Sequence, residues 1–184
     1  MADFKNIALT GLSFTDGAIN TSGLEEDAYW IPLSFFATLQ VPVETPANPL
    51  AAIEITGNHT LKAGKAPIPL FTMFDKSGMD SPLAGEKYSK ISMPNAKLFQ
   101  PQPTAENAAN FAIMSNQRGI LLIKRSTGGY FIQIGNKGLY ASIKEGSVKF
   151  GDGPTGTPGI EFQIEAPSIM PYYVYKGELP VAGA

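Results

Sequence analysis

Apolar and polar residues alternate over short stretches of this chain, and turn-forming residues separate the stretches. The 184 residues include 19 glycines and 15 prolines, so few segments are long enough for a helix. Alternation with a period of two over four to eight residues is typical of β-strands with one buried face. On this basis we predict strands or strand pairs at residues 28–36, 50–57, 67–75, 86–100, 119–125, 129–135, 139–151, 160–165 and 170–177. Strands recurring at spacings of roughly 8–12 residues indicate a β-sandwich or barrel.

The segment 86–100 is expected to form a long β-hairpin. Its sequence, "EKYSKISMPNAKLFQ", places apolar residues among lysines, and Pro94-Asn95 is a typical turn pair. The lysines could line one side of the hairpin, where they would discourage unwanted strand pairing at a sheet edge. The side chains that we assign to this hairpin are Lys87, Tyr88, Lys90, Ile91, Met93, Lys97 and Phe99.

One segment breaks the β pattern. Residues 104–115, "TAENAANFAIMS", begin with Thr104, a good N-cap residue, and carry Glu106 in the first turn. Small side chains form a stripe along this segment, at Ala105, Ala108, Ala109 and Ala112. We predict one helix of about three turns that packs closely on a sheet, with Phe111 as its anchor. The expected fold class is therefore mainly β (all-β or α+β): a β-sandwich or barrel with one flanking α-helix at about 104–115 and a long β-hairpin.

The length of the chain is sufficient for one domain with a substantial buried core. We expect residues 1–184 to form a single domain, in which residues 1–25 are a candidate N-terminal arm. The proline-rich segment 41–49, "VPVETPANP", is expected to be a loop, and residues 179–184 a flexible tail.

The charged residues are few and unevenly distributed. Their fraction is 16%, against the roughly 25% usual for soluble domains, so much of the surface must be neutral. Such a surface fits burial against other copies of the chain, and it also fits an ordinary polar surface. Residues 1–60 hold seven acidic side chains and one basic side chain, a net charge of −6, whereas the remainder has +4. This asymmetry could mark head-to-tail self-association, or it could disappear on folding. The overall net charge of −2 provides no basic field for nucleic acid.

Candidate catalytic and metal-binding residues are few. The chain has no cysteine, which excludes disulfides and thiol chemistry. His59 is the only histidine and no serine has nucleophile-elbow glycines, so we expect a surface or hydrogen-bonded structural histidine. The consecutive carboxylates at residues 25–27 point in different directions, which favours a solvated or subunit-facing acidic patch over a cation site. A paired-carboxylate hydrolase stays open, although no pair is singled out. We expect neither enzymatic activity nor a cofactor.

Residues 150–159, "FGDGPTGTPG", have the glycine content of a phosphate-binding loop. Such a loop presents successive backbone N–H groups and leads into a helix, usually with a lysine. Here Pro154 and Pro158 lack the N–H group, Asp152 would repel a phosphate, and the following segment alternates like a strand. We predict that this segment only connects two strands.

Five stretches together carry a resemblance to a known family. They are "MADFKNIALTGL", "AYWIPLSFFATL", "ITGNHTLKAGKAPIPLFTMFDKSG", "GEKYSKISMPNAKLFQPQPTAENAANFAIMSNQRGILLIKRSTGGYFIQIG" and "FGDGPTGTPGIEFQIEAPSIMPYYVY". In this order the chain resembles the major tail proteins (tail tube proteins) of tailed bacteriophages, particularly a group from phages of Bacteroidota hosts. The resemblance covers nearly the whole chain and consists of pattern and element order, without a catalytic motif.

The resemblance implies a virion protein that is made in the cytoplasm of the host and is not associated with a membrane. In such tails, copies of one chain form hexameric rings that stack into a hollow tube, and other tail proteins bind the tube ends. Each subunit contributes a long hairpin to an inner barrel, through which the phage DNA passes without sequence-specific binding. By position, the hairpin 86–100 and the strand pair near 68–74 are candidates for the wall of the lumen. The N-terminal arm and the loop 41–49 are candidates for contacts between rings.

Two other interpretations stay open. The chain could be another virion component on a β scaffold, such as a tail terminator or head decoration protein. It could instead be a carbohydrate-binding β-sandwich, in which aromatic side chains form a platform for a sugar. The candidates for this platform are Trp30, Tyr29, Tyr130, Tyr140 and the segment 172–175. Aromatic residues that alternate within strands are, however, more often part of the core.

Overall fold

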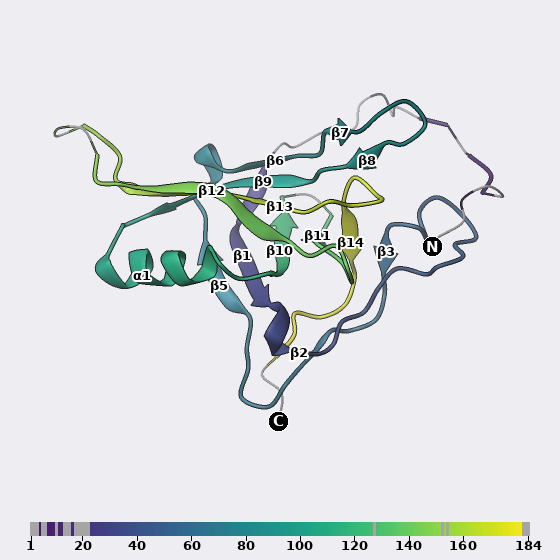
Figure 1. Ribbon diagram of the computed structural model, residues 1–184, viewed down its shortest axis with the longest axis horizontal. Helices are drawn as coiled ribbons and strands as arrows, with labels where there is room; N and C mark the ends of the chain where they lie inside the picture. The colour runs from purple at the N-terminus through teal and green to yellow at the C-terminus, as the bar shows by residue number, and fades with distance from the viewer. Residues whose placement is uncertain are drawn as a thin grey trace.

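Two β-sheets packed face to face form the body of the protein (Figure 1). The computed structural model describes residues 4, 7–9, 11–12, 16, 23–126, 128–151, 153 and 155–181. The fold is mainly β with one α-helix among these residues, as the alternating pattern predicts. Two short 3₁₀-helices, η1 (Leu33–Phe35) and η2 (Phe74–Lys76), connect strands.

The larger sheet has six strands in the order β3-β14-β11-β10-β1-β5. Their bounds are β1 (Leu24–Pro32), β3 (Glu54–Ile55), β5 (Ile68–Phe71), β10 (Gly119–Arg125), β11 (Phe131–Ile134) and β14 (Tyr173–Tyr175). Neighbouring strands are antiparallel except β14 and β3, which are parallel. The first five residues of β10 are all buried, because both faces of this sheet are covered.

The smaller sheet has four antiparallel strands in the order β12-β13-β9-β6. Their bounds are β6 (Gly78–Asp80), β9 (Asn95–Pro101), β12 (Ser142–Lys149) and β13 (Gly159–Glu165). Alternate residues of β13 are buried, at Ile160, Phe162 and Ile164. One face of this sheet therefore belongs to the core. Two further strand pairs are β2 (Phe36–Thr38) with β4 (Thr60–Leu61), and β7 (Leu83–Ala84) with β8 (Ile91–Ser92).

Two hydrophobic clusters lie on opposite faces of the six-stranded sheet. The first lies between the two main sheets and includes Trp30, Leu98, Leu121, Ile123 and Phe162. The second lies on the far face and includes Ile31, Phe36, Leu61, Ile120, Leu122 and Tyr175. Consecutive residues of β10 alternate between the clusters, as the strand period of two requires. The six-stranded sheet is thus the central layer.

The helix α1 (Ala105–Met114) lies within one residue of its predicted bounds. The backbone N–H of Asn107 donates to Thr104 Oγ1 at 3.1 Å, which confirms the predicted N-cap. Phe111 is the predicted anchor: its ring lies 5.7 Å from that of Phe162, between centroids. The expected close packing of the alanine stripe is wrong, because Ala105, Ala109 and Ala112 are exposed.

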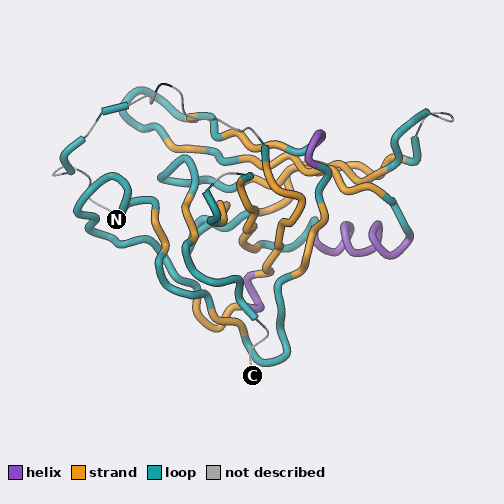
Figure 2. The backbone as a smooth tube through the Cα atoms, turned by 180° about the vertical axis from the view of Figure 1, so that it is seen from behind, coloured by secondary structure: helices purple, strands orange, loops and turns teal. Residues whose placement is uncertain are grey.

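The reason is the position of the helix beside the strands and not across them (Figure 2). The helix joins the first cluster through two residues of its C-terminal half, Phe111 and the buried Met114.

A long hairpin is present, but its predicted bounds of 86–100 are wrong, because this segment supplies only the tip and the returning arm. Strand β6 pairs with β9 and β7 pairs with β8, so the hairpin runs from 78 to 101 and its tip comprises residues 85–90. The expected turn at Pro94-Asn95 is wrong, because Asn95 begins β9 and pairs with Asp80 and Glu165. At the tip, Gly85 and Tyr88 have φ angles of 98° and 67°, which reverse the chain.

The predicted arm, loop and tail are only partly described. Residues 24–25 of the expected arm belong to β1, and most of the remaining arm lies outside the described residues. Segment 41–49 contains no helix or strand. Of the expected tail, Leu179 packs against the second cluster and Pro180 is buried, whereas residues 182–184 lie outside the described part. The first two tail residues therefore belong to the body.

Candidate functional site: sheet edges and projecting hairpins

Among the described residues, the four-stranded sheet ends in two open edges, β12 and β6. Strand β12 is eight residues long, and within the described residues it pairs only with β13. An unpaired strand edge is a template for pairing with another chain. On β12, Lys144 forms an ion pair with Glu165 at 2.8 Å, and Lys149 forms one with Glu161. The Glu165 hydrogen bond raises the pKa of Lys144, so this lysine stays charged and paired.

The outer face of this sheet is polar. Ala96 pairs with Ile164 and Leu98 with Phe162 on the core face, so the residues between them point outward. The charged side chains of the outer face are Lys97, Lys144, Lys149, Asp80, Glu145, Glu161 and Glu165. Three basic and four acidic groups leave a net charge of −1, so this face is not a cationic groove for phosphates.

The seven predicted hairpin residues divide into a tip and a base. At the tip, the Lys87 ammonium lies 5.0 Å from the ring centre of Tyr88, whose side chain is 93% exposed. Lys90 donates to the Gly85 carbonyl, which closes the turn. The other members follow the returning strands: Ile91 in β8, Met93 after it, and Lys97 and Phe99 in β9.

At the base, Phe99 is buried although it lies on the outer face. The Lys76 ammonium lies 4.6 Å from its ring centre, and a Cβ atom added to Gly159 would collide with the ring. The Met93 backbone N–H donates to the Pro82 carbonyl at 2.9 Å, which joins the two arms of the hairpin. Phe99 is therefore enclosed by its own subunit, whereas the tip residues and Lys97 are exposed.

The second candidate for the lumen wall lies in the other sheet. Strand β5 pairs with β1, as part of the six-stranded sheet. Phe71 at the end of β5 and Phe74 at the start of η2 are exposed. The segments 68–74 and 86–100 therefore do not form one continuous strand pair. Of the two, only the hairpin contributes to the sheet with the polar outer face.

Strands β12 and β13 form a second projecting hairpin. They are antiparallel and the glycine-rich segment joins them, which confirms that this segment connects two strands. Figure 1 shows this hairpin extending to the left, whereas the β7–β8 end extends to the right. The side chain of Phe150, directly after β12, is 79% exposed. Sequence reasoning missed this residue, although an aromatic beside a glycine-rich turn was a signal.

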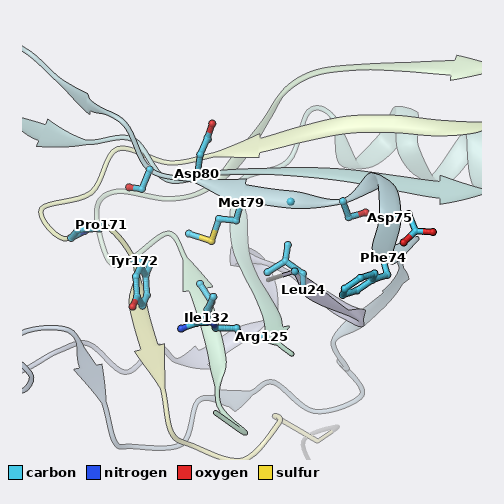
Figure 3. A pocket seen from close by; sticks show the side chains of 13 residues that line it. Leu24, Phe74, Asp75, Met79, Asp80, Arg125, Ile132, Pro171 and Tyr172 are labelled. Atoms are coloured by element: carbon cyan, nitrogen blue, oxygen red, sulfur yellow. The ribbon is translucent and has the colours of Figure 1, made fainter. Parts of the chain in front are cut away.

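A pocket of about 620 Å³ opens beside the β6 edge. In Figure 3, apolar side chains from both main sheets and from η2 surround it: Leu24, Phe74, Met79 and Ile132. Asp75 and Asp80 stand at its rim, and their carboxylates point away from the cavity. The sequence did not predict this pocket, because its walls come from segments that are distant along the chain.

His59 is a hydrogen-bonded structural residue, as expected. The Gln40 backbone N–H donates to His59 Nδ1 at 3.1 Å, so the ring proton is on Nε2 and is donated to Gln133 Oε1 at 2.9 Å. The ring stacks on Tyr175 with centroids 4.3 Å apart. Burial lowers the pKa of His59, against the opposite effect of the Gln133 hydrogen bond. Both ring nitrogens are therefore used in hydrogen bonds to residues of the same chain.

The acidic run of β1 is partly neutralised within the chain. Glu25 forms an ion pair with Lys124 at 2.9 Å, while Glu26 and Asp27 are exposed. In the described part of the chain, no three His, Asp or Glu side chains are grouped as a metal site requires. No helix among the described residues combines the length and apolarity needed to span a membrane.

The aromatic residues considered for a sugar platform are divided between the two cores. Trp30 belongs to the first cluster and Tyr175 to the second, and both are fully buried. They lie on opposite faces of the central sheet and cannot contact one ligand.

No protein-family model matches the chain, and no curated protein or solved structure is significantly similar to it.

Proposed function

We propose that this protein is a structural virion subunit that assembles into stacked hexameric rings and forms a bacteriophage tail tube. The tube is a conduit for genome ejection. The resemblance of the sequence to tail tube proteins motivates the proposal. The observation that carries it is the four-stranded sheet with two open edges, of which β12 is eight residues long.

The two edges are suited to pairing with each other. They belong to opposite sides of one sheet, so joining β12 of one copy to β6 of the next uses two different surfaces. A contact of this kind generates a ring when the rotation closes. Because β12 and β6 run in opposite directions within the sheet, the joined strands are antiparallel and the sheet continues from copy to copy.

The outer face of this sheet then lines the lumen. Its net charge of −1 per subunit leaves no cationic surface to retain DNA phosphates. The two hairpins extend the sheet in opposite directions and lengthen the wall of each ring (Figure 1). A conduit needs both properties, a continuous wall and a surface that does not hold the genome.

Electron microscopy of the purified full-length chain, over a range of concentrations, tests the proposal. We expect hollow tubes or six-fold rings in negative stain, and sedimentation that depends on concentration. Closed rings that never stack would indicate a tail terminator. A monomer at all concentrations contradicts the proposal, and binding of that monomer to a glycan array would support the carbohydrate-binding alternative.

A further inference from the structure

Phe150 continues the core-facing row of β12 beyond the end of the core. Val148 packs against the first cluster, and a Cβ atom added to Gly146 would lie 2.6 Å from Phe111, so both positions face inward. Side chains two residues apart lie on the same face of a strand. This spacing places Phe150 next in the row, yet its ring is 79% exposed. Among the described residues, Phe150 belongs to neither hydrophobic cluster, and it lies beside Gly151, Gly156 and Thr157 of its own hairpin turn.

The pocket beside β6 lies on the same face of the same sheet, at the opposite edge. Met79 of β6 packs toward the first cluster and lines this pocket. Phe74 also lines it and is exposed. A volume of about 620 Å³ has room for a phenylalanine side chain with the backbone that carries it. The lining offers aromatic–aromatic and sulfur–aromatic contacts to such a ring.

We propose that Phe150 of one copy occupies the β6 pocket of the next copy around the ring. The inference rests on the proposed function and names the contact that fixes the joined edges. Because Phe150 follows β12 and the pocket borders β6, joining the two edges brings the ring and the cavity together on one face. The protruding group and its receptor are different surfaces of one chain, as a closed ring requires.

Charge supports a second copy as the occupant. Lys149, which forms an exposed ion pair with Glu161, precedes Phe150, and Asp75 and Asp80 stand at the rim of the pocket with their carboxylates directed outward (Figure 3). An inserted Phe150 would bring the lysine of one copy toward the acidic rim of the next. Complementary charges of this kind fix the register of an interface.

Cysteine cross-linking tests the contact directly, since the natural chain has no cysteine. Phe150→Cys and Met79→Cys are made as two separate proteins, mixed in equal amounts at an assembling concentration and oxidised. We expect a disulfide-linked pair of the two variants. The matched control pairs Met79→Cys with Val181→Cys, because Val181 is 81% exposed but lies in the C-terminal segment. The first pair should yield at least about tenfold more linked product, because a disulfide requires Cα atoms within about 7 Å.

Assembly of uncross-linked variants gives a second measurement. Phe150→Asp should raise the concentration for half-assembly by at least about tenfold, whereas Phe150→Leu, which keeps an apolar side chain, should stay within about threefold of the natural chain. The thermal midpoint of the monomer should be unchanged in both, because Phe150 does not contact the core. Equal cross-linking of the two cysteine pairs, or normal assembly of Phe150→Asp, overturns the inference.

The outcomes separate this inference from the proposed function. If the natural chain forms tubes but the Phe150 variants behave normally, only the contact is wrong. If the natural chain stays monomeric, the tube proposal fails and the contact fails with it. If the cross-linked protein sediments under native conditions as a closed dimer and not as a ring or tube, the contact holds and the hexameric ring is contradicted.

Discussion

At the scale of single residues, His59 makes the stability of the fold depend on pH. Nδ1 accepts the Gln40 N–H and is not available for a proton, and burial lowers the pKa of the ring. Below the unfolded pKa of about 6.5, the unfolded chain binds the proton more strongly than the folded one. The stability that the neutral ring provides is therefore present above pH 6.5 and is lost as pH falls through the lower folded pKa.

Urea unfolding at pH 7.5 and pH 5.5 measures this effect. We expect the free energy of unfolding of the natural chain to be lower at pH 5.5 than at pH 7.5, because the lowered pKa of the buried ring lets the unfolded chain take up the proton first. The His59→Gln variant has no titrating side chain at position 59, and ordinary carboxylates titrate below pH 5.5. Its free energy of unfolding should therefore change much less between the two pH values. Equal pH dependence of the two proteins contradicts the assignment of a neutral, buried His59.

Gly146 is the residue that allows the helix to dock. A Cβ atom there would lie 2.6 Å from Phe111 Cζ and 2.9 Å from the Glu161 carbonyl oxygen, which belongs to the backbone and cannot move aside. Gly146→Ala should lower the free energy of unfolding by about 1–3 kcal/mol. Gly78→Ala is the matched control, since no atom lies within 4 Å of its Cβ position, and it should change stability by less than about 0.5 kcal/mol. Chemical unfolding of both variants checks the prediction, and equal effects would contradict it.

At the scale of elements, the sequence predicted what depends on neighbouring residues. The Thr104 cap and the alternation of β13 are local patterns, and both are found where they were expected. The turn of the long hairpin was misplaced because Pro94-Asn95 has turn chemistry, whereas the real tip depends on Tyr88 at a positive φ, which its residue type does not reveal. The alanine stripe was misjudged because the face that a helix buries depends on where tertiary packing places it.

The tip of this hairpin can be removed without touching the core. Residues 86–89 are exposed, their backbone hydrogen bond runs within the turn from the Ser89 N–H to the Glu86 carbonyl, and the pairing of β6 with β9 lies beyond them. A chain with these four residues deleted should remain folded, with a thermal midpoint within about 4 °C of the natural chain. If the tip extends the lumen wall toward the next ring, this chain should form single rings and no tubes. Electron microscopy decides this, and tubes of normal length would contradict the role of the tip.

At the scale of the whole molecule, the two open edges and the pocket depend on the fold as a unit. Strands β12 and β6 are separated by more than 60 residues along the chain but border the same sheet. The pocket brings Leu24 of β1, Met79 of β6 and Ile132 of β11 into one wall. Neither feature could be predicted from local patterns, because each depends on strand order. The proposed assembly follows from the strand order. Because β12 and β6 are the first and last strands of one sheet, each can face the opposite edge of a neighbouring copy.

The charge of the proposed lumen gives the last prediction. Glu145 lies on the outer face of β12, and Glu145→Lys changes the net charge of that face from −1 to +1 in every subunit. Tubes of this variant should retain duplex DNA at low salt and release it as salt increases, because phosphate contacts are lost with counterion competition. Glu178→Lys makes the same change of charge in an exposed C-terminal segment outside this sheet. We expect DNA to co-sediment with Glu145→Lys tubes and not with natural or Glu178→Lys tubes. Equal retention by both variants would show that the outer face of β12 does not line the channel.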